Sequence, residues 1–568
     1  MTAEGYQAVH PPEWPTTGSP RRIAILGWAR LALQAAEGTG YNLSASELAA
    51  GLAMMGHTVI YLSSGMAYSP RPGIRIRFRE SWRGVACHEV VNSPVLSPSA
   101  ANFANAAGEI SQPALTERIT AFLDRHRVEL VHAHALEGFS MDLVGAVRST
   151  GRPFIITPHN YWYVCPQVDL LHREHELCMD YEGGRRCERC LEASTVLRQK
   201  YKRIITRASE RALGPKQTEL IRLKLKRTLK RSAAEAELPT RVDRNLLPEE
   251  AVARGHDIEQ DDDGLLRHRF MDSATVATEP PVPLEPDTNE RFCTSSDVHL
   301  RVMHPLGGRR SAGVRAMSAA DLITPPSEFN RELHASMGVP RVKIRVVRYG
   351  QPHFDQINRR ARRSPFYRCR PWDPATATRP LRFGFFGTTR PNKGLDILAR
   401  AVPLLERDIR QRCQFIIRAQ GNDWPFRKRL APYPEVNFLG GYDILQLINA
   451  AGEYDVGLLP HIWFDNSPLV MWEHLHAGKM IIASRLGGAA DTIRSLDDSE
   501  TGNGLFFAGG RPDDLARQIT RVVTGEVGVP SAAEVHAASE LQTYPGHVAE
   551  VDGLYADLLR GLTEPTTS

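Results

Sequence analysis

The chain has 568 residues, a length that suits more than one domain. Apolar residues make up 42% and charged residues 24%, as in soluble globular enzymes, and the net charge of +5 is too small to indicate that the whole protein binds nucleic acid. No apolar stretch is long enough to span a bilayer, and the first twenty residues lack the basic and apolar regions of a secretory signal, so we expect a cytoplasmic protein.

The first part of the chain alternates strand and helix patterns after a flexible lead at residues 1–20, which is rich in Pro, Gly and Thr. The run RRIAILGWA is typical of a buried strand, NLSASELAAGLAMMG has helical spacing, and HTVIYLSS indicates a second strand. Two more buried strands are expected in RVELVHAHAL and RPFIITPHNYW. These patterns predict an N-terminal α/β domain over residues 21–194.

The pattern is lost over residues 195–310. Residues 198–231 hold 13 Lys or Arg against two Glu, and an acidic patch and a Pro-rich stretch follow. This composition predicts a basic segment and then an insertion of low order. We expect residues 311–375 to return to the N-terminal domain and to continue as a linker.

A second α/β domain is expected over residues 376–530. Its predicted strands are LRFGFFG, QFIIRAQ, VNFLGG, YDVGLLP and KMIIAS, with helices between them. Strands that alternate with helices form a parallel sheet covered on both faces, and ligands bind such sheets at the carboxyl ends of the strands. Residues 531–568 are expected to form a last helix, which packs back on the first domain, and a tail.

Charged side chains follow two of these C-terminal strands, LRFGFFG and YDVGLLP. Lys393 lies in a strand–helix loop, where an ammonium group and a helix dipole both favour a phosphate. Asp465 lies in a later loop and Glu473 eight residues on, on a helix that Pro468 helps to open. A carboxylate there can accept both hydroxyls of a ribose, and the backbone amides after Asn466 can meet a diphosphate or a sugar. Taken singly, an ordinary surface Lys and a solvated helix carboxylate are the simpler interpretations.

The combined spacing resembles the family 4 glycosyltransferases of the two-Rossmann-domain (GT-B) type. Their donor box reads here as Asp465, Glu473, Ala477-Gly478, MIIAS and Gly487-Gly488, and their Lys loop as Gly387, Lys393 and Gly394. The resemblance covers roughly residues 20–190 and 315–530. It implies two Rossmann-like domains that face each other across a cleft, with the donor on the C-terminal domain and the acceptor on the N-terminal one.

The resemblance also implies the roles of individual residues. Lys393 and Arg390 would stabilise the diphosphate, and Glu473 would bind the ribose. Asp465 and the residues after it would bind the sugar: Asn466, Ser467 and Leu469. Two positions depart from the family, since Asp465 stands where Glu is usual and Thr388 where Arg is usual. Arg390, two residues later, could replace that charge.

In the N-terminal domain, Gly40 is the best match to the family's Gly-rich loop, which approaches the donor diphosphate; a plain strand–helix turn is the alternative. The family has a His in a Thr-x-His segment beside the transferred sugar, and by that match His159 is a catalytic residue together with Asp465 and Lys393. His159 would contact a sugar hydroxyl and steady the developing positive charge through its backbone carbonyl. His134 is a second candidate, on the acceptor side.

Four cysteines lie within 26 residues, at Cys165, Cys178, Cys187 and Cys190. In a reducing compartment such a cluster indicates a metal before disulfides, and four thiolates satisfy tetrahedral zinc. We therefore expect a structural zinc, which would brace the acceptor rim. A metal-free loop and an iron–sulfur cluster remain alternatives, with His172 and His175 as substitute ligands. The transfer itself is expected to need no cofactor.

The basic segment at residues 195–231 alternates Leu with Lys or Arg in RLKLKRTLKR. A basic amphipathic segment can lie on an anionic bilayer, whereas a solvated helical face is the plainer interpretation. Membrane contact would place the protein at the inner membrane face, beside lipid-linked acceptors. No nucleic acid is expected, because the charge balance elsewhere is near neutral.

These observations predict a retaining glycosyltransferase of the hexosyltransferase class. It would move a sugar from a nucleotide-sugar donor to a glycan, lipid-linked or small-molecule acceptor, as in polysaccharide biosynthesis. Retention rests on the family resemblance alone. One alternative is a sugar-nucleotide epimerase, which would need an acid/base pair that cannot be assigned here. Another is a nucleotide-sugar-binding protein of the same fold with impaired catalysis, which the departures at Asp465 and Thr388 favour.

Overall fold

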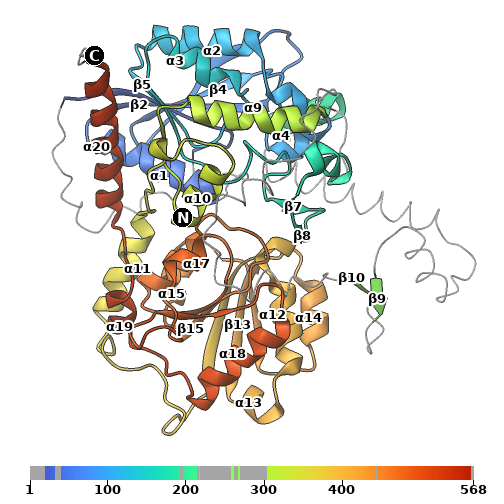
Figure 1. Ribbon diagram of the computed structural model, residues 1–568, viewed down its shortest axis with the longest axis vertical. Coiled ribbons are helices and arrows are strands. Elements are labelled where there is room, and N and C mark those ends of the chain that lie inside the picture. Colours follow the sequence, from blue (N-terminus) through green and yellow to red (C-terminus); the bar gives the residue numbers. More distant parts are fainter. Residues whose placement is uncertain are drawn as a thin grey trace, which may run out of the picture.

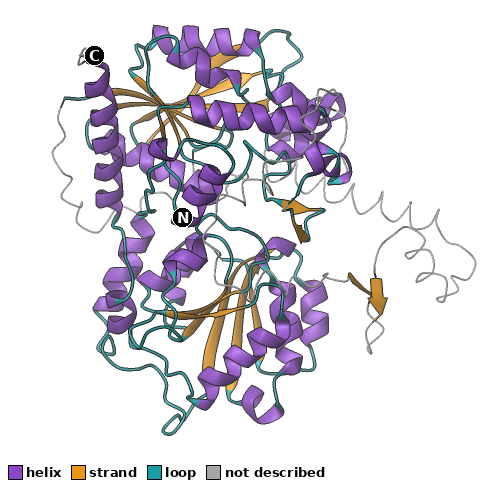
Figure 2. Ribbon diagram, in the orientation of Figure 1, coloured by secondary structure: helices purple, strands orange, loops and turns teal. Residues whose placement is uncertain are grey.

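The computed structural model describes residues 19–31, 40–178, 180–191, 196–213, 217, 258–260, 266–268, 304–442 and 444–563. Almost all of the expected flexible lead, Gly38, most of the expected insertion and most of the basic segment beyond residue 213 lie outside these residues. Figure 1 shows two α/β domains, one above the other, and Figure 2 shows that each contains a sheet covered by helices. The α/β class with two Rossmann-like domains is therefore confirmed.

The N-terminal sheet has the strand order β11-β6-β5-β1-β2-β4-β3, and only the β3–β4 pair is antiparallel. Without the edge strand β3 this is the Rossmann order, in which the strand order reverses between β1 and β5. The strands are β1 (Arg22–Gly27), β2 (Thr58–Ala67), β3 (Arg75–Trp82), β4 (Val85–Val91), β5 (Leu130–Ala133), β6 (Phe154–Ile156) and β11 (Leu322–Ile323).

Alternating residues of β1 face different cores, which is why its sequence is apolar throughout. Ile23 and Ile25 pack in one buried cluster, and Ala24 and Leu26 pack in another. The helices around this sheet are α1 (Gly40–Met54), η2 (Ser99–Glu109), α2 (Pro113–Arg125), α3 (Asp142–Arg148), α9 (Pro305–Ala319), α10 (Glu328–Ser336) and the last helix, α20 (Tyr544–Thr563).

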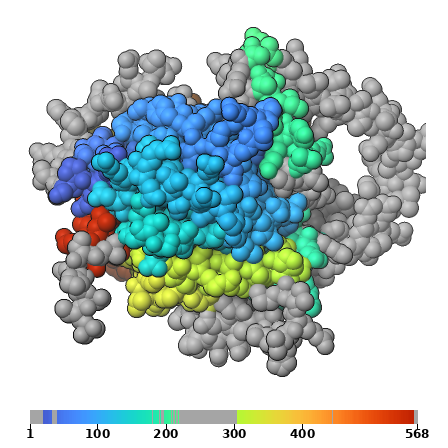
Figure 3. Space-filling view, turned by 90° about the horizontal axis from the view of Figure 1, so that it is seen from above, coloured from blue at the N-terminus to red at the C-terminus, as the bar shows by residue number. Residues whose placement is uncertain are grey.

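Two segments from far along the chain complete the N-terminal domain. The first is α9, which packs on η2 and α3, and Figure 3 shows its yellow-green residues along one side of the blue and cyan part. Helix α20 packs on α1, and its Tyr544 hydroxyl donates to the Glu47 carbonyl at 2.7 Å. The Tyr555 hydroxyl is hydrogen-bonded to His132 at 2.7 Å. The chain therefore ends on the domain where it began.

The C-terminal sheet is wholly parallel, in the order β14-β13-β12-β15-β16-β17. Counted along the chain this is 3-2-1-4-5-6, the Rossmann order, with the switch point between β12 and β15. The strands are β12 (Leu381–Thr388), β13 (Cys413–Gln420), β14 (Val436–Gly440), β15 (Val456–Leu459), β16 (Met480–Ser484) and β17 (Gly504–Phe507).

The helices and short turns of this domain bring its loops to the carboxyl ends of the strands. They are η6 (Pro391–Lys393), α12 (Leu395–Leu404), α13 (Arg407–Gln411), α14 (Trp424–Leu430), α15 (Ile444–Ala450), α16 (Leu469–His476), α17 (Gly488–Thr492), α18 (Pro512–Thr524) and α19 (Ala532–Ala537). η5 (Arg341–Lys343) packs on α10 of the N-terminal domain, and α11 (Pro352–Arg362) links the domains, with contacts to both α16 and α20. No helix of the described residues has the length and apolarity that crossing a membrane requires.

A smaller, irregular region follows β6 and contains the four cysteines. Its elements are β7 (Leu171–His172), β8 (Glu176–Leu177), η3 (Glu182–Gly184) and η4 (Arg186–Arg189), followed by α4 (Val196–Leu213). A separate antiparallel pair, β9 (Ile258–Gln260) and β10 (Leu266–His268), lies in the sequence between α4 and α9.

Candidate active site

The Lys loop joins β12 to α12 at the switch point of the C-terminal sheet. Its last residue, Gly394, has a φ of +72°, and a Cβ there would lie 1.6 Å from the Pro460 carbonyl oxygen. Only glycine fits both the backbone conformation and the space, so the loop is held directly against the end of β15. This contact fixes Lys393 at the edge of the sheet where ligands bind in doubly wound folds.

Lys393 and Asp465, which are 72 residues apart in sequence, form an ion pair in the structure. The Lys393 Nζ donates to Asp465 Oδ2 at 2.6 Å and lies 5.2 Å from the centre of the Trp463 ring. Asp465 is only 7% exposed, whereas the Lys393 side chain is 32% exposed. Asp465 is thus fixed by burial, whereas the Lys393 side chain remains partly accessible to solvent.

Gly487 and Gly488 hold the loop that carries Asp465. Gly487 has a φ of +60°, and a Cβ there would lie 2.3 Å from the Asp465 carbonyl oxygen. The Gly488 amide donates to that same oxygen at 2.8 Å. The Gly-Gly turn after β16 is therefore the support of the acidic loop, which explains why these two sequence features occur together.

The residues after Asp465 lie where the two domains meet. The Asn466 side-chain amide donates to the Pro158 carbonyl at 3.1 Å, and its Oδ1 is buried with no protein partner. The Ser467 hydroxyl accepts from the Trp472 indole at 2.8 Å. Leu469 opens α16, and its Cδ1 lies 3.3 Å from the position of a Cβ on Gly40. Gly40 and Leu469, both expected at the donor, thus face each other from different domains.

Glu473 is buried on α16 and has a partner that the sequence did not suggest. His353 Nε2, on α11, lies 3.1 Å from Glu473 Oε1. This side chain comes from the segment that links the domains, so the Glu473 carboxylate is oriented from outside the C-terminal Rossmann unit.

His159 stands at the carboxyl end of β6 in a row of aromatic rings. Its Nδ1 is 2.8 Å from the Tyr349 hydroxyl and its Nε2 is 2.8 Å from His134 Nδ1. The Tyr349 ring is stacked on it with 7° between the planes. Burial lowers the pKa of His159 to about 3, so the ring is neutral near pH 7 and offers one donor and one acceptor.

His134 and His132 extend this row into the domain. Burial lowers the pKa of both, in His132 to about 3, with neighbouring histidines adding to the effect. His132 is held by Tyr555 and by Thr157, each at 2.7 Å. His134 keeps its Nε2 buried without a protein partner. His159 and His134, both candidates from the sequence, are therefore in direct contact.

The four cysteines of the predicted zinc site gather in one region. Burial raises the pKa of the Cys187 thiol to about 12, and Cys165, Cys178 and Cys190 add to that shift. The Arg173 amide donates to Cys190 Sγ at 3.4 Å. However, no three Cys, His, Asp or Glu side chains of the described residues are arranged to hold a metal ion. The donor set suits zinc, and the predicted zinc site stays a prediction.

Two family models match the chain, one in each domain. Residues 39–213 match the model described as Glycosyltransferase Family 4, and residues 380–525 match the one described as Glycosyl transferases group 1. The chain belongs to the family 4 glycosyltransferases. The resemblance based on the donor box and the Lys loop is thus confirmed, and the protein is a transferase of the GT-B type.

Among solved structures, sucrose-phosphate synthase from Thermosynechococcus elongatus is 14% identical, with a TM-score of 0.51, and the match covers 95% of this chain and all of that one. HepE from Anabaena is 11% identical, with a TM-score of 0.49 over 94% of this chain and all of that one. The catalytic domain of starch synthase IV from Arabidopsis thaliana is 12% identical (TM-score 0.46), over 96% and 100% of the two chains. At such identities the first of these matches shows the fold alone. No curated protein matches this glycosyltransferase in sequence.

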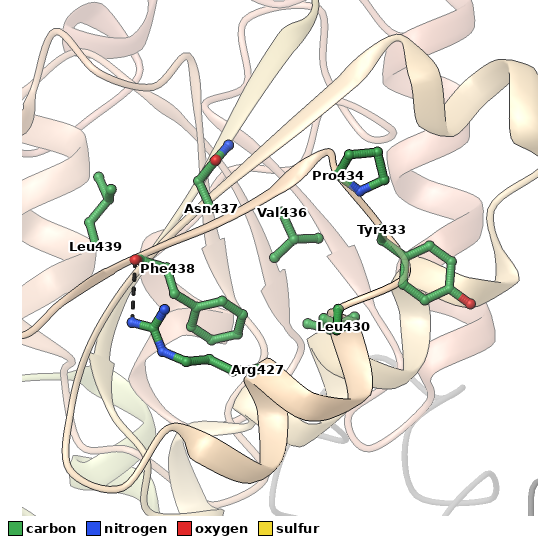
Figure 4. Close-up of a pocket in the computed structure, with 9 residues that line it drawn as sticks. Arg427, Leu430, Tyr433, Pro434, Val436, Asn437, Phe438 and Leu439 are labelled. Atoms are coloured by element: carbon green, nitrogen blue, oxygen red, sulfur yellow. Dashed lines mark hydrogen bonds between the residues drawn. The ribbon is translucent and has the colours of Figure 1, made fainter.

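A hollow of about 300 Å³ lies elsewhere in the glycosyltransferase, at the edge strand β14 (Figure 4). Arg427 lines it and donates to the Phe438 carbonyl at 3.3 Å. It contains none of the predicted site residues and lies at an edge of the sheet, two strands away from β12 and the switch point. We therefore do not assign the donor to it.

Three residues around the predicted site of this glycosyltransferase had not been identified from the sequence. They are Asp169, which accepts from the Asn392 amide at 3.4 Å, Tyr349 beside His159, and His353 beside Glu473. Asp169 lies within the Cys-rich segment and carries no recognisable motif. Tyr349 and His353 flank the start of α11, where Pro352 marks a helix entrance but gives no indication of a partner 120 residues away.

Proposed function

We propose that this glycosyltransferase moves a sugar from a nucleotide-sugar donor to a glycan, lipid-linked or small-molecule acceptor, with retention of anomeric configuration. The contact between Lys393 and Asp465 at the switch point of the C-terminal sheet carries the proposal. A half-exposed ammonium group anchored there can exchange its carboxylate partner for a diphosphate, which offers more charge. The N-terminal domain is then the acceptor domain.

In this proposal the donor lies along the loops that meet at the domain junction. Lys393 and the exposed Arg390 stabilise the diphosphate, and Glu473, oriented by His353, accepts the ribose hydroxyls. Asp465 and the backbone of Asn466 to Leu469 bind the sugar, beside Gly40. The buried Oδ1 of Asn466 without a protein partner supports a polar ligand at this point.

Transfer proceeds by attack of an acceptor hydroxyl on the anomeric carbon from the side of the leaving diphosphate. The bond from the anomeric carbon to the diphosphate oxygen breaks, the new C–O bond forms, and the acceptor proton passes to the leaving phosphate oxygen. Stabilising that diphosphate is the main catalytic effect, which we assign to Lys393 and Arg390. His159 is neutral, so it contributes hydrogen bonds and its backbone carbonyl rather than a proton. No cofactor is needed for these steps.

Product analysis tests this assignment. The protein is incubated with nucleotide sugars based on UDP, GDP and ADP, with and without acceptors, after a thermal-shift screen has shown which donor binds. We expect a glycoside formed only with acceptor, whose anomeric proton in NMR has the configuration of the donor. An epimerised nucleotide sugar formed without acceptor would favour the epimerase. Donor binding with neither transfer nor hydrolysis would favour the impaired binding protein.

We further propose that helix α4, in the basic segment, lies on an anionic membrane at the inner face, where it would meet lipid-linked acceptors. Leu197, Tyr201 and Ile205 are spaced by four residues and form one apolar stripe, and their exposures are 64%, 59% and 64%. The exposed Arg198 and Lys202 flank it. Cations beside an exposed apolar stripe are the signature of an interfacial helix.

The opposite side of α4 is the one attached to the domain. The Arg203 guanidinium donates to the Ser97 carbonyl at 2.5 Å and to the Gly65 carbonyl. Lys200 lies 5.5 Å from the centre of the Tyr68 ring. The helix therefore docks through its basic side chains and leaves its apolar stripe outward, the reverse of an ordinary surface helix.

Vesicle flotation tests the membrane contact. We expect the full chain to float with phosphatidylglycerol vesicles at low salt and to bind phosphatidylcholine weakly. Replacing Leu197, Tyr201 and Ile205 by Ser should abolish flotation, whereas Val342→Ser, which removes an apolar side chain that is 94% exposed elsewhere, should not. No flotation by the full chain would refute the contact. Flotation that appears only after residues 218–303 are deleted would mean that the chain itself covers the stripe.

We also propose that Cys165, Cys178, Cys187 and Cys190 hold a structural zinc rather than an iron–sulfur cluster. The mutual effect of their thiols on one another's pKa supports their closeness. ICP-MS of the pure protein should give one zinc per chain, lost in Cys187→Ser and kept in Cys369→Ser, where the thiol is exposed and remote in sequence. Absence of stoichiometric metal would refute the proposal, and visible absorbance with bound iron would favour the cluster.

A further inference from the structure

Asp169 is an acidic side chain of the N-terminal domain that reaches the Lys loop of the C-terminal domain. Its neighbours in sequence, Val168 and Leu170, both have left-handed backbone, with φ of 75° and 52°. Such conformations are unusual for residues with branched side chains and persist only where the surroundings enforce them. Leu170 is buried in the N-terminal core, and the Tyr161 amide donates to the Val168 carbonyl at 2.9 Å.

This anchored turn directs Asp169 across the domain boundary. The Asn392 amide, one residue before Lys393, donates to Asp169 Oδ2 at 3.4 Å. Lys393 and Arg390 both favour the charged form of the carboxyl, while Asp465 and Glu174 oppose it. Burial is the largest influence, and it raises the pKa of Asp169 to about 6. Glu137, Tyr161 and Cys165, on the N-terminal side, also sense its charge.

The same two cations are those that the proposed function assigns to the donor diphosphate. We infer that Asp169 competes with the diphosphate for Lys393 and Arg390 and thereby promotes release of the nucleoside diphosphate product. This rests on the proposed function, because it requires the diphosphate at Lys393. Asp465 pairs with Lys393 from the C-terminal domain, whereas Asp169 approaches the same loop from the N-terminal domain.

Asp169 is expected to weaken nucleotide binding, whereas Lys393 and Arg390 strengthen it. Removing its charge takes a like charge away from the bound diphosphate, so nucleotide binding becomes tighter. Asp169→Asn keeps the shape and an oxygen for the Asn392 amide. We expect the Kd for nucleotide sugar and for nucleoside diphosphate to fall about tenfold. The off-rate of the diphosphate, measured by stopped flow, should fall by a similar factor.

Binding should also depend on pH in a way that identifies Asp169. A nucleotide sugar is a diphosphate diester, whose charge does not change between pH 5.5 and 7.5. In the wild type its affinity should rise as the pH falls toward 6, because protonated Asp169 no longer repels the diphosphate. In Asp169→Asn this dependence should be absent. Both curves should meet near pH 5.5.

The experiment is calorimetric titration of the full chain with the nucleotide sugar found by thermal shift. Asp169→Asn and Asp169→Ser are compared with Glu174→Gln, which removes an exposed carboxylate from the same loop and should change the Kd little. Unchanged or weaker binding in folded Asp169 variants would overturn the inference. If Lys393→Ala still loses affinity, the proposed function survives that result. If no nucleotide sugar binds the wild type, the proposed function itself fails.

Discussion

The C-terminal sheet ends in charged side chains where the domains meet, whereas the N-terminal sheet ends in histidines. On the first lie Lys393, Arg390 and Asp465. On the second lie His159 and His134, hydrogen-bonded to each other and held neutral by burial. The two Rossmann units share a strand order but not a surface chemistry. A charged diphosphate would suit the first and uncharged hydroxyls the second, as the proposed function requires.

The largest effect is expected when the pH is lowered, because acid should destabilise the N-terminal domain. Folded His132 and His159 have pKa values lowered to about 3, so between pH 6.5 and 3 the unfolded chain binds protons that the folded chain does not. Stability is therefore full above about pH 6.5 and lost as the pH falls. Each such histidine lowers the free energy of unfolding by up to about 1.4 kcal/mol for each pH unit below 6.5.

Thermal unfolding at pH 7.5 and 5.5 measures this loss. We expect the transition of the N-terminal domain to move down by about 10 °C, on the scale of 2–4 °C per kcal/mol for a domain of this size. His132→Asn, which cannot charge, should show a smaller downward shift. Equal midpoints at both pH values would mean that these rings are not held neutral by the fold.

The second test changes the Lys loop of the C-terminal domain. Gly394→Ala places a Cβ against the Pro460 carbonyl and removes the left-handed residue that fits Lys393 to the sheet. We expect transfer to fall about 100-fold, as for a misplacement of about 1 Å, with a lower melting temperature. In Gly452→Ala, in the same domain, the new Cβ has no atom within 4 Å, so transfer and melting temperature should both stay unchanged. Equal behaviour of the two variants would show that the Lys loop is not held in this way.

The third test addresses the neutral side. His159→Ala removes the hydrogen bonds to Tyr349 and His134, and we expect kcat to fall about 10- to 100-fold, the scale of one or two buried hydrogen bonds. Donor affinity should change less than kcat. Because His159 does not titrate near neutrality, His159→Gln should keep the shape of the wild-type pH profile between pH 6 and 8. Loss of an inflection in that range would assign the proton to His159 instead.

The smallest effect is expected where the chain departs from its family. Asp465→Glu restores the usual residue, but Lys393 already reaches the shorter side chain at 2.6 Å. We therefore expect transfer within about tenfold of the wild type, because the change is one methylene in a loop that Gly488 also holds. A gain well above tenfold would show that Asp465 impairs this enzyme.

The sequence indicated the charged side better than the neutral one. Lys393, Asp465 and Glu473 follow predicted strands at family spacing, so their shared sheet edge could be inferred from local pattern. The contacts of His353 and Tyr349 could not be inferred in this way, because they depend on how the linking helix α11 is placed between the two domains. The position of Asp169 depends on a turn in which Val168 and Leu170 have left-handed backbone, and the sequence does not predict such a turn. Strand β3 was likewise not predicted, because it is an edge strand without a continuous apolar run.

The most direct test of the central claim is the affinity of the screened nucleotide sugar for Lys393→Ala, with Lys428→Ala as a control at an exposed Lys of the same domain. The Lys393 ammonium is the anchored cation at the switch point, so its loss should weaken binding about 100-fold and abolish transfer, with unchanged circular dichroism. Lys428→Ala should match the wild type. Wild-type affinity and turnover in folded Lys393→Ala would contradict the placement of the donor on the C-terminal domain.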